Sequence, residues 1–107
     1  ASTGSAAALE AAASLGQAIA AVVSRGGRPD RARSSLARVQ APTLLIVGGL
    51  DHVVIQLNQK AYDQLNAEKQ LLIIPGATHL FEEPGTLEEV ARLATQWFKR
   101  YLRAQQV

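Results

Sequence analysis

Three polar side chains of this 107-residue chain have the types and positions that acid–base chemistry requires. Asp51 follows an apolar run that ends at two glycines, and His79 follows a second apolar run that ends at Pro75. A carboxylate beside an imidazole fixes the tautomer of the ring and stabilises its cation. Ser2 directly precedes a run of helix-forming residues, so we expect its hydroxyl at a helix N-terminus, where backbone N–H groups favour negative charge.

Two apolar runs determine where these side chains would lie. Residues 43–47 (TLLIV) predict the central strand of a parallel sheet, covered on both faces, and residues 71–74 (LLII) predict another buried strand. Residues 18–24 predict a third strand, although Ala20 and Ala21 could equally continue a helix. Because the carboxyl ends of parallel strands lie at one edge of the sheet, we expect Asp51 and His79 side by side there.

Helical patterns separate the predicted strands. We expect helices over residues 3–14, 29–37, 54–67 and 86–102. In the last one, Thr86 and Glu89 have the spacing of a capping box, and Trp97 and Phe98 are interpreted as core residues. The alternation of helix and strand predicts an α/β fold: a small three-stranded parallel sheet with flanking helices, in a single domain over residues 1–107.

Composition narrows the possible partners. The chain has no cysteine, which excludes disulfides and thiolate metal sites and fits a cytoplasmic location. Its net charge is only +2, and the arginines between residues 25 and 38 are interpreted as a solvated loop, so we expect no nucleic-acid partner. The apolar runs are too short to span a membrane. We expect no cofactor and no metal, because His52, His79 and Asp51 match no common ligand spacing.

Four segments together resemble the C-terminal half of an α/β-hydrolase, beginning inside the nucleophile elbow. Residues 1–4 (ASTG) resemble the last four residues of the G-x-S-x-G elbow, and residues 41–51 resemble the strand and acid turn of that family. Residues 75–81 (PGATHLF) resemble its histidine loop, and residues 85–101 its final helix. The stretch GATHLFEEPG is similar to the dienelactone-hydrolase-like branch.

This resemblance implies a serine hydrolase that cleaves small carboxylic esters. Ser2 would be the nucleophile, His79 the base and Asp51 the acid of a triad, and the backbone N–H of Thr3 would donate to the oxyanion. The strand that leads into the elbow and the second oxyanion donor of the family are not in this sequence, so we expect weak activity.

The same resemblance implies an open edge on the first strand, which predicts a homodimer or a larger homo-oligomer. Two alternatives remain at this point. The chain could be a hydrolase-derived binding or assembly module that has lost catalysis, or a truncation product without a function of its own.

Overall fold

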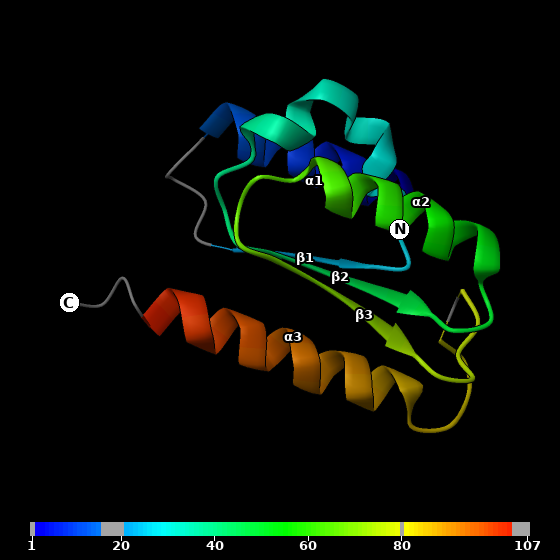
Figure 1. Cartoon of the computed structure of the whole chain (residues 1–107). Coiled ribbons are helices and arrows are strands. Elements are labelled where there is room, and N and C mark those ends of the chain that lie inside the picture. The colour runs from blue at the N-terminus through cyan, green and yellow to red at the C-terminus, as the bar shows by residue number, and fades with distance from the viewer. Residues whose placement is uncertain (1, 16–20, 80, 104–107) are drawn as a thin grey trace.

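The chain alternates helices and strands in the predicted order (Figure 1). The computed structural model describes residues 2–15, 21–79 and 81–103, with side chains described for residues 9–15, 21–79 and 81–101. The elements are helix α1 (Ser2–Leu15), strand β1 (Val22–Arg25), 3-10 helix η2 (Pro29–Arg38), strand β2 (Thr43–Gly48), helix α2 (His52–Gln64), strand β3 (Lys69–Ile74) and helix α3 (Thr86–Arg103).

The three strands form one parallel sheet in the order β1-β2-β3. Val22 of β1 is in register with Thr43 of β2, which in turn is in register with Lys69 of β3. Every residue of β2 is buried, as the continuous apolar run predicted for a central strand covered on both faces. The predicted fold class, a small parallel sheet with flanking helices, is confirmed.

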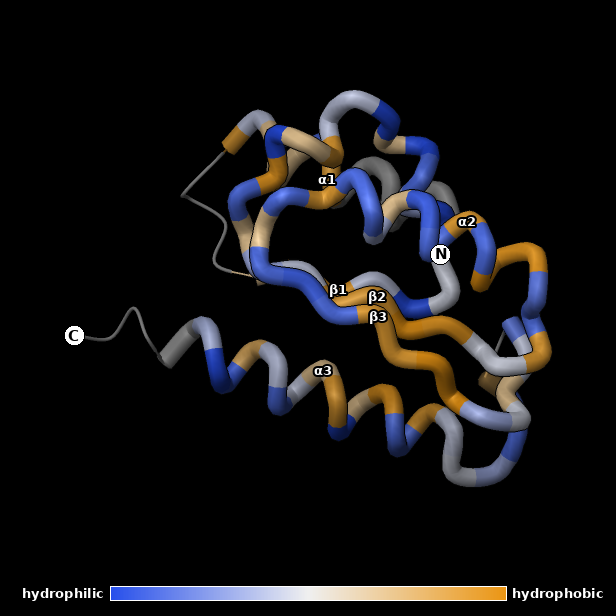
Figure 2. Tube along the Cα trace, viewed as in Figure 1, coloured by the Kyte–Doolittle hydropathy of each residue, from blue (hydrophilic) through white to orange (hydrophobic). Residues whose placement is uncertain are grey.

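Helices cover both faces of this sheet. α1, η2 and α2 lie on one face and α3 lies on the other (Figure 1). Successive residues of β2 face opposite sides, so Leu45 packs among the three helices while Leu44 and Ile46 pack toward α3. Hydrophobic residues accordingly run along β2 and β3 between the two helical layers (Figure 2).

The outer strands differ from their predictions. The structure places β1 at Val22–Arg25, and residues 18–20 of the predicted strand lie outside the described residues. β3 begins at Lys69 rather than at residue 71, and the prediction that its apolar run is buried is wrong for most of the run. Ile74 is buried, but Ile73 is 48% exposed. β3 is more exposed than β2 because, within the described residues, it has a neighbouring strand on one side only.

Helix α3 keeps its predicted extent but not its predicted cap. The Thr86 hydroxyl contacts the carbonyl oxygens of Phe81 and Glu83, each at 2.8 Å, and the Glu89 N–H donates to Gly85 at 3.1 Å. The capping box is therefore wrong, because Thr86 is already the first helical residue and its hydroxyl faces the preceding loop.

Of the two aromatic residues interpreted as core, one is buried. Trp97 is 5% exposed, and its indole N–H donates to the carbonyl of Pro42 at 3.2 Å. Phe98 is 36% exposed, so its assignment to the core is wrong. Each residue along a helix is rotated by about 100° from the one before, so Phe98 cannot face the core in the same direction as Trp97.

Within the described residues, no helix combines the length and the hydropathy that crossing a bilayer requires.

The position of Leu45 gives a direct test of this packing. Leu45 is fully buried on the central strand, so Leu45→Ala should lower the free energy of unfolding by about 2–5 kcal/mol, measured by urea denaturation. Leu87 is 44% exposed, and Leu87→Ala is the matched control, with an expected change within about 0.5 kcal/mol. Equal losses in the two variants would contradict the placement of Leu45 in the core.

Candidate active site

Asp51 stands in the tight connection between β2 and α2. Its backbone N–H donates to Gly48 at 3.0 Å, and its carbonyl accepts the N–H of Ile55 at 2.9 Å, so it occupies the N-cap position of α2. An aspartate at this position usually accepts a hydrogen bond from the first turn of the helix. The Asp51 carboxylate makes no such cap bond, which leaves it available to another partner.

His79 lies in the loop between β3 and α3, and main-chain hydrogen bonds join this loop to the Asp51 turn. The N–H of Gly49 donates to the carbonyl of Ile74 at 2.8 Å, and the N–H of Leu50 donates to the carbonyl of Ala77 at 3.0 Å. The loops that follow the carboxyl ends of β2 and β3 are therefore joined to each other by main-chain hydrogen bonds.

The structure brings the two predicted side chains together. His79 Nδ1 lies 3.0 Å from Asp51 Oδ2. An ionised carboxylate can only accept a hydrogen bond, so the pair requires the proton on Nδ1 and leaves the lone pair of the ring on Nε2. The Asp51 side chain is 19% exposed and the His79 side chain 40% exposed, so the carboxylate is the inner and the ring the outer member of the pair. This arrangement can accept a proton from a hydroxyl and return it to a leaving group.

Two glycines at the ends of neighbouring strands make room for the histidine loop. A Cβ atom on Gly48 would lie 2.5 Å from the carbonyl oxygen of Ala77 and 2.7 Å from that of Thr78. A Cβ atom on Gly26, at the end of β1, would lie 3.1 Å from the carbonyl oxygen of His79. The ends of two neighbouring strands thus lack side chains where the loop passes over them.

Phe81 anchors the loop just after the histidine. Its side chain is 1% exposed and packs in the core beneath α3, although its backbone has a φ of 54°. A positive φ in a residue other than glycine costs on the order of 1–2 kcal/mol, which the burial of a phenylalanine side chain can offset. The sequence contained a signal for this role, an aromatic residue two positions after the histidine, which we did not interpret.

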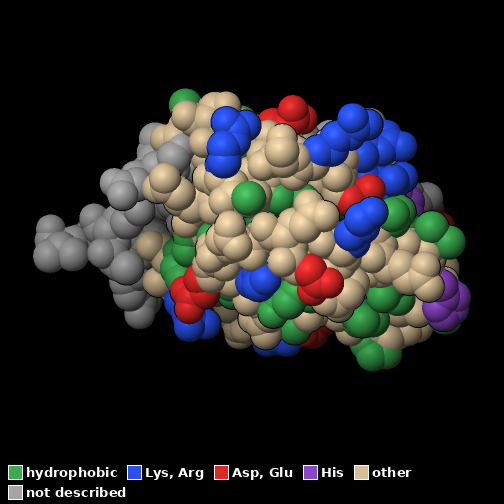
Figure 3. All heavy atoms as spheres, turned by 45° about the horizontal axis from the view of Figure 1, so that its top comes forward, with side chains coloured by type: hydrophobic (Ala, Val, Ile, Leu, Met, Phe, Trp, Pro, Cys, Tyr) green, Lys and Arg blue, Asp and Glu red, His purple; other side chains and the backbone are tan. Residues whose placement is uncertain are grey.

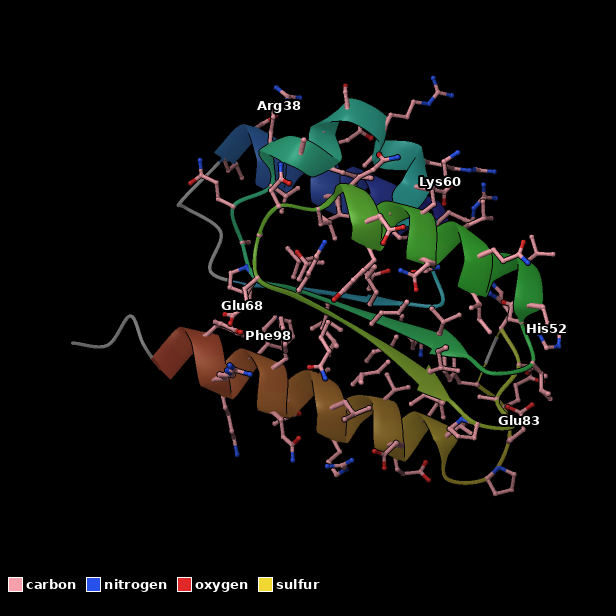
Figure 4. All side chains as sticks on the ribbon, in the orientation of Figure 1. Arg38, His52, Lys60, Glu68, Glu83 and Phe98 are labelled. Atoms are coloured by element: carbon pink, nitrogen blue, oxygen red, sulfur yellow. The ribbon has the colours of Figure 1, made fainter. Side chains whose placement is uncertain are left out.

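His52, the other histidine, is a surface residue. It is exposed and points outward from the first turn of α2 (Figure 4). Histidine side chains are visible at this end of the molecular surface (Figure 3). Among the residues with described positions, no three His, Cys, Asp or Glu side chains are grouped as metal ligands.

Ser2 and Thr3 form the beginning of α1, and their side chains lie outside the described residues. The backbone places Ser2 at the first position of the helix, and this end of α1 lies toward the side to which the strands point (Figure 1). Their roles as nucleophile and oxyanion donor stay predictions.

Comparison with known proteins identifies the family. A family model described as "PET hydrolase-like" matches residues 1–106. The chain belongs to the PET hydrolase-like family. The crystal structure of a dienelactone hydrolase from Anabaena variabilis is 60% identical and superimposes with a TM-score of 0.92, covering 94% of this PET hydrolase-like chain and 47% of the neighbour. The resemblance to an α/β-hydrolase is therefore confirmed.

Two curated relatives of this PET hydrolase-like chain carry a different name. They are proteins from two strains of Mycobacterium tuberculosis, each named "Putative phosphoribosyl transferase" and each 62% identical over 102 residues. The matched segment is 95% of this chain but 23% of either relative, so the chain spans about a quarter of their length. The transferase name thus describes proteins of which most lies beyond the matched segment.

The close approach at Gly48 generates a prediction about the Asp51–His79 pair. Gly48→Ala must displace the histidine loop, because the new methyl group would overlap two backbone carbonyls. We expect a loss of about 1–3 kcal/mol in the free energy of unfolding, together with altered NMR signals from the His79 ring.

Gly85→Ala is the control for this experiment. Gly85 has a φ of 82° with no atom within 4 Å of the new Cβ, so the substitution adds backbone strain without a clash. We expect it to lower stability with a smaller change in the His79 ring signals than Gly48→Ala gives. Unchanged ring signals in Gly48→Ala would refute the steric argument.

Proposed function

We propose that this chain carries the catalytic triad of a serine hydrolase for small carboxylic esters, with Ser2 as nucleophile, His79 as base and Asp51 as acid. The observation that carries the proposal is the 3.0 Å contact between His79 Nδ1 and Asp51 Oδ2 at the carboxyl ends of two adjacent parallel strands. The proposal is further supported by membership of a hydrolase family and by the dienelactone hydrolase neighbour.

The proposed reaction begins with attack by the serine oxygen. Ser2 Oγ bonds to the ester carbonyl carbon as its proton moves to His79 Nε2, and the carbonyl oxygen becomes an oxyanion. The N–H of Thr3, in the first turn of α1, donates to that oxygen. The carbon–alkoxy bond then breaks, and His79 returns the proton to the departing alcohol.

The second half of the reaction releases the acid. Water attacks the acyl carbon while His79 takes one of its protons, and the bond to Ser2 Oγ breaks as the serine regains a proton. Asp51 remains ionised throughout and stabilises the cationic ring. No cofactor enters these steps.

The transferase name of the mycobacterial relatives is compatible with this proposal. The chain covers 23% of those proteins, so a hydrolase segment can lie within a longer protein that bears another name. We also keep the cytoplasmic location as part of the proposal, because a chain without cysteine fits a reducing compartment.

Hydrolysis of a short-chain p-nitrophenyl ester tests the base and the nucleophile. We expect His79→Ala and Ser2→Ala each to lower kcat/KM by about 10³-fold or more, because triad members act as a unit. His52→Ala is the matched control, since His52 is the exposed neighbour of Asp51, and its rate should stay within about twofold of the parent. Equal rates in the parent and Ser2→Ala would show that Ser2 is not the nucleophile.

A fluorophosphonate provides an independent test of Ser2. The serine oxygen would bond to phosphorus with loss of fluoride, and the serine proton would pass to His79. The expected adduct lies on the N-terminal tryptic peptide and is absent in Ser2→Ala and His79→Ala. An adduct at another residue, or none at all, would favour the alternative of a module without catalysis.

We also propose that copies of this chain associate. Within the described residues β1 pairs with β2 only, and large apolar side chains are exposed on β3 and α3, among them Ile73 at 48% and Leu87 at 44%. Open strand edges and exposed apolar side chains favour association. We expect light scattering at micromolar concentration to give at least the mass of a dimer, and a stable monomer would contradict this.

A further inference from the structure

The loop that carries His79 contains a carboxylate which the proposed reaction does not use. Glu83 lies in the segment that leads into α3, at the same end of the molecule as His52 (Figure 4). From the sequence, a glutamate at this position would favour the N-terminus of the following helix. The structure shows a different arrangement, in which the Glu83 carboxylate reaches back to Thr78, the residue directly before His79.

We propose that Glu83 is a positioning residue that holds the His79 ring against Asp51 by clamping Thr78. The consequence for catalysis rests on the function proposed above, whereas the clamp itself is a statement about the orientation of His79.

The contacts of the clamp use both carboxylate oxygens. The backbone N–H of Thr78 donates to Glu83 Oε1 at 3.0 Å, and the Thr78 hydroxyl donates to Oε2 at 2.8 Å. Because these two donors belong to one residue, they fix the peptide unit and the side chain of Thr78 together. Hydrogen bonds to an ionised acceptor are stronger than neutral ones. The same bonds lower the pKa of Glu83, since they stabilise its charged form.

The clamp acts where burial does not restrain the loop. Ala77 is fully buried and Phe81 is 1% exposed, but Thr78 between them is exposed. The Thr78 carbonyl accepts the N–H of Phe81 at 3.1 Å, so all three polar groups of Thr78 are engaged within the loop. The residue next to it carries the ring.

Glu83 is itself held by the first turn of α3. Its carbonyl oxygen accepts the N–H of Thr86 at 3.1 Å and the Thr86 hydroxyl at 2.8 Å. The restraint on His79 therefore extends from a long helix through Glu83 and Thr78 to the ring. Loss of the carboxylate would leave His79 anchored by the neighbouring backbone but free to rotate away from Asp51.

The imidazole tautomer measures this orientation without any assay of activity. Long-range ¹H–¹⁵N NMR correlations distinguish a ring protonated on Nδ1 from one protonated on Nε2. In the parent protein we expect the Nδ1–H form, since Nδ1 faces Asp51. Glu83→Ala should shift His79 to a mixture rich in the Nε2–H form, while the exposed neighbour variant Glu82→Ala should keep the parent spectrum.

Two further variants distinguish the effect of the hydrogen bonds to Thr78 from the effect of the negative charge on Glu83. Glu83→Gln keeps an oxygen that can accept the Thr78 N–H and an amide that can donate to its hydroxyl, so it should retain most of the Nδ1–H form. Thr78→Val removes the hydroxyl bond and keeps the N–H bond, so it should give an intermediate spectrum. If Glu83→Ala does not fold, an unchanged tautomer in Thr78→Val overturns the proposal and a shifted one supports it.

Ester hydrolysis then reports the catalytic consequence. We expect Glu83→Ala to lower kcat by about 10- to 100-fold with little change in KM, as for a misplaced catalytic group, and Glu83→Gln to restore most of the rate. An unchanged tautomer in Glu83→Ala, or an equal shift in Glu82→Ala, overturns the clamp. A tautomer shift in a protein without esterase activity supports the clamp and refutes the proposed function instead.

Discussion

The close contact between the backbone at the end of β2 and the loop that follows β3 is the constraint on which the site depends. Gly48 has room for no side chain there, because a Cβ atom would lie 2.5 Å from the carbonyl oxygen of Ala77. The Leu50 N–H bonds to that same carbonyl at 3.0 Å, so the two loops are joined as well as close. The separation of Asp51 and His79 follows from this main-chain contact, since both side chains arise within three residues of it.

The site departs from local preference at two residues, Asp51 and Phe81. Asp51 occupies a helix N-cap but directs its carboxylate to His79, so the first turn of α2 is without that cap bond. Phe81 adopts a φ of 54°, which its complete burial beneath α3 offsets. Violations of local rules that gather around one pair of side chains are expected where function, rather than stability, determines the conformation.

Features that follow from local sequence patterns could be predicted, whereas contacts that no such pattern marks could not. The strands at residues 43–47 and 71–74 are marked by continuous apolar runs, and parallel pairing then places Asp51 beside His79. The capping box failed because the Thr86 hydroxyl has two carbonyl partners in the preceding loop, which no spacing reveals. The role of Gly48 is equally invisible, since it depends on a loop that lies about thirty positions further along the chain.

The Asp51–His79 pair and Ser2, the proposed nucleophile, depend on different parts of the packing. Asp51 and His79 lie in the loops that follow two neighbouring strands, and main-chain hydrogen bonds join these loops. The geometry of the pair therefore depends on β2, β3, the start of α2 and the loop before α3. Ser2 begins α1, whose buried residues Leu9 and Ala12 belong to the core on the opposite face of the sheet from α3. The pair can therefore form independently of α1, and in the proposed triad the Ser2 hydroxyl would be brought to it by the packing of α1 on η2 and the sheet. In the proposed hydrolase, catalysis would then respond to substitutions that disturb the packing of α1. The His79–Asp51 contact would respond only to those that disturb β2, β3, the start of α2 or the loop before α3.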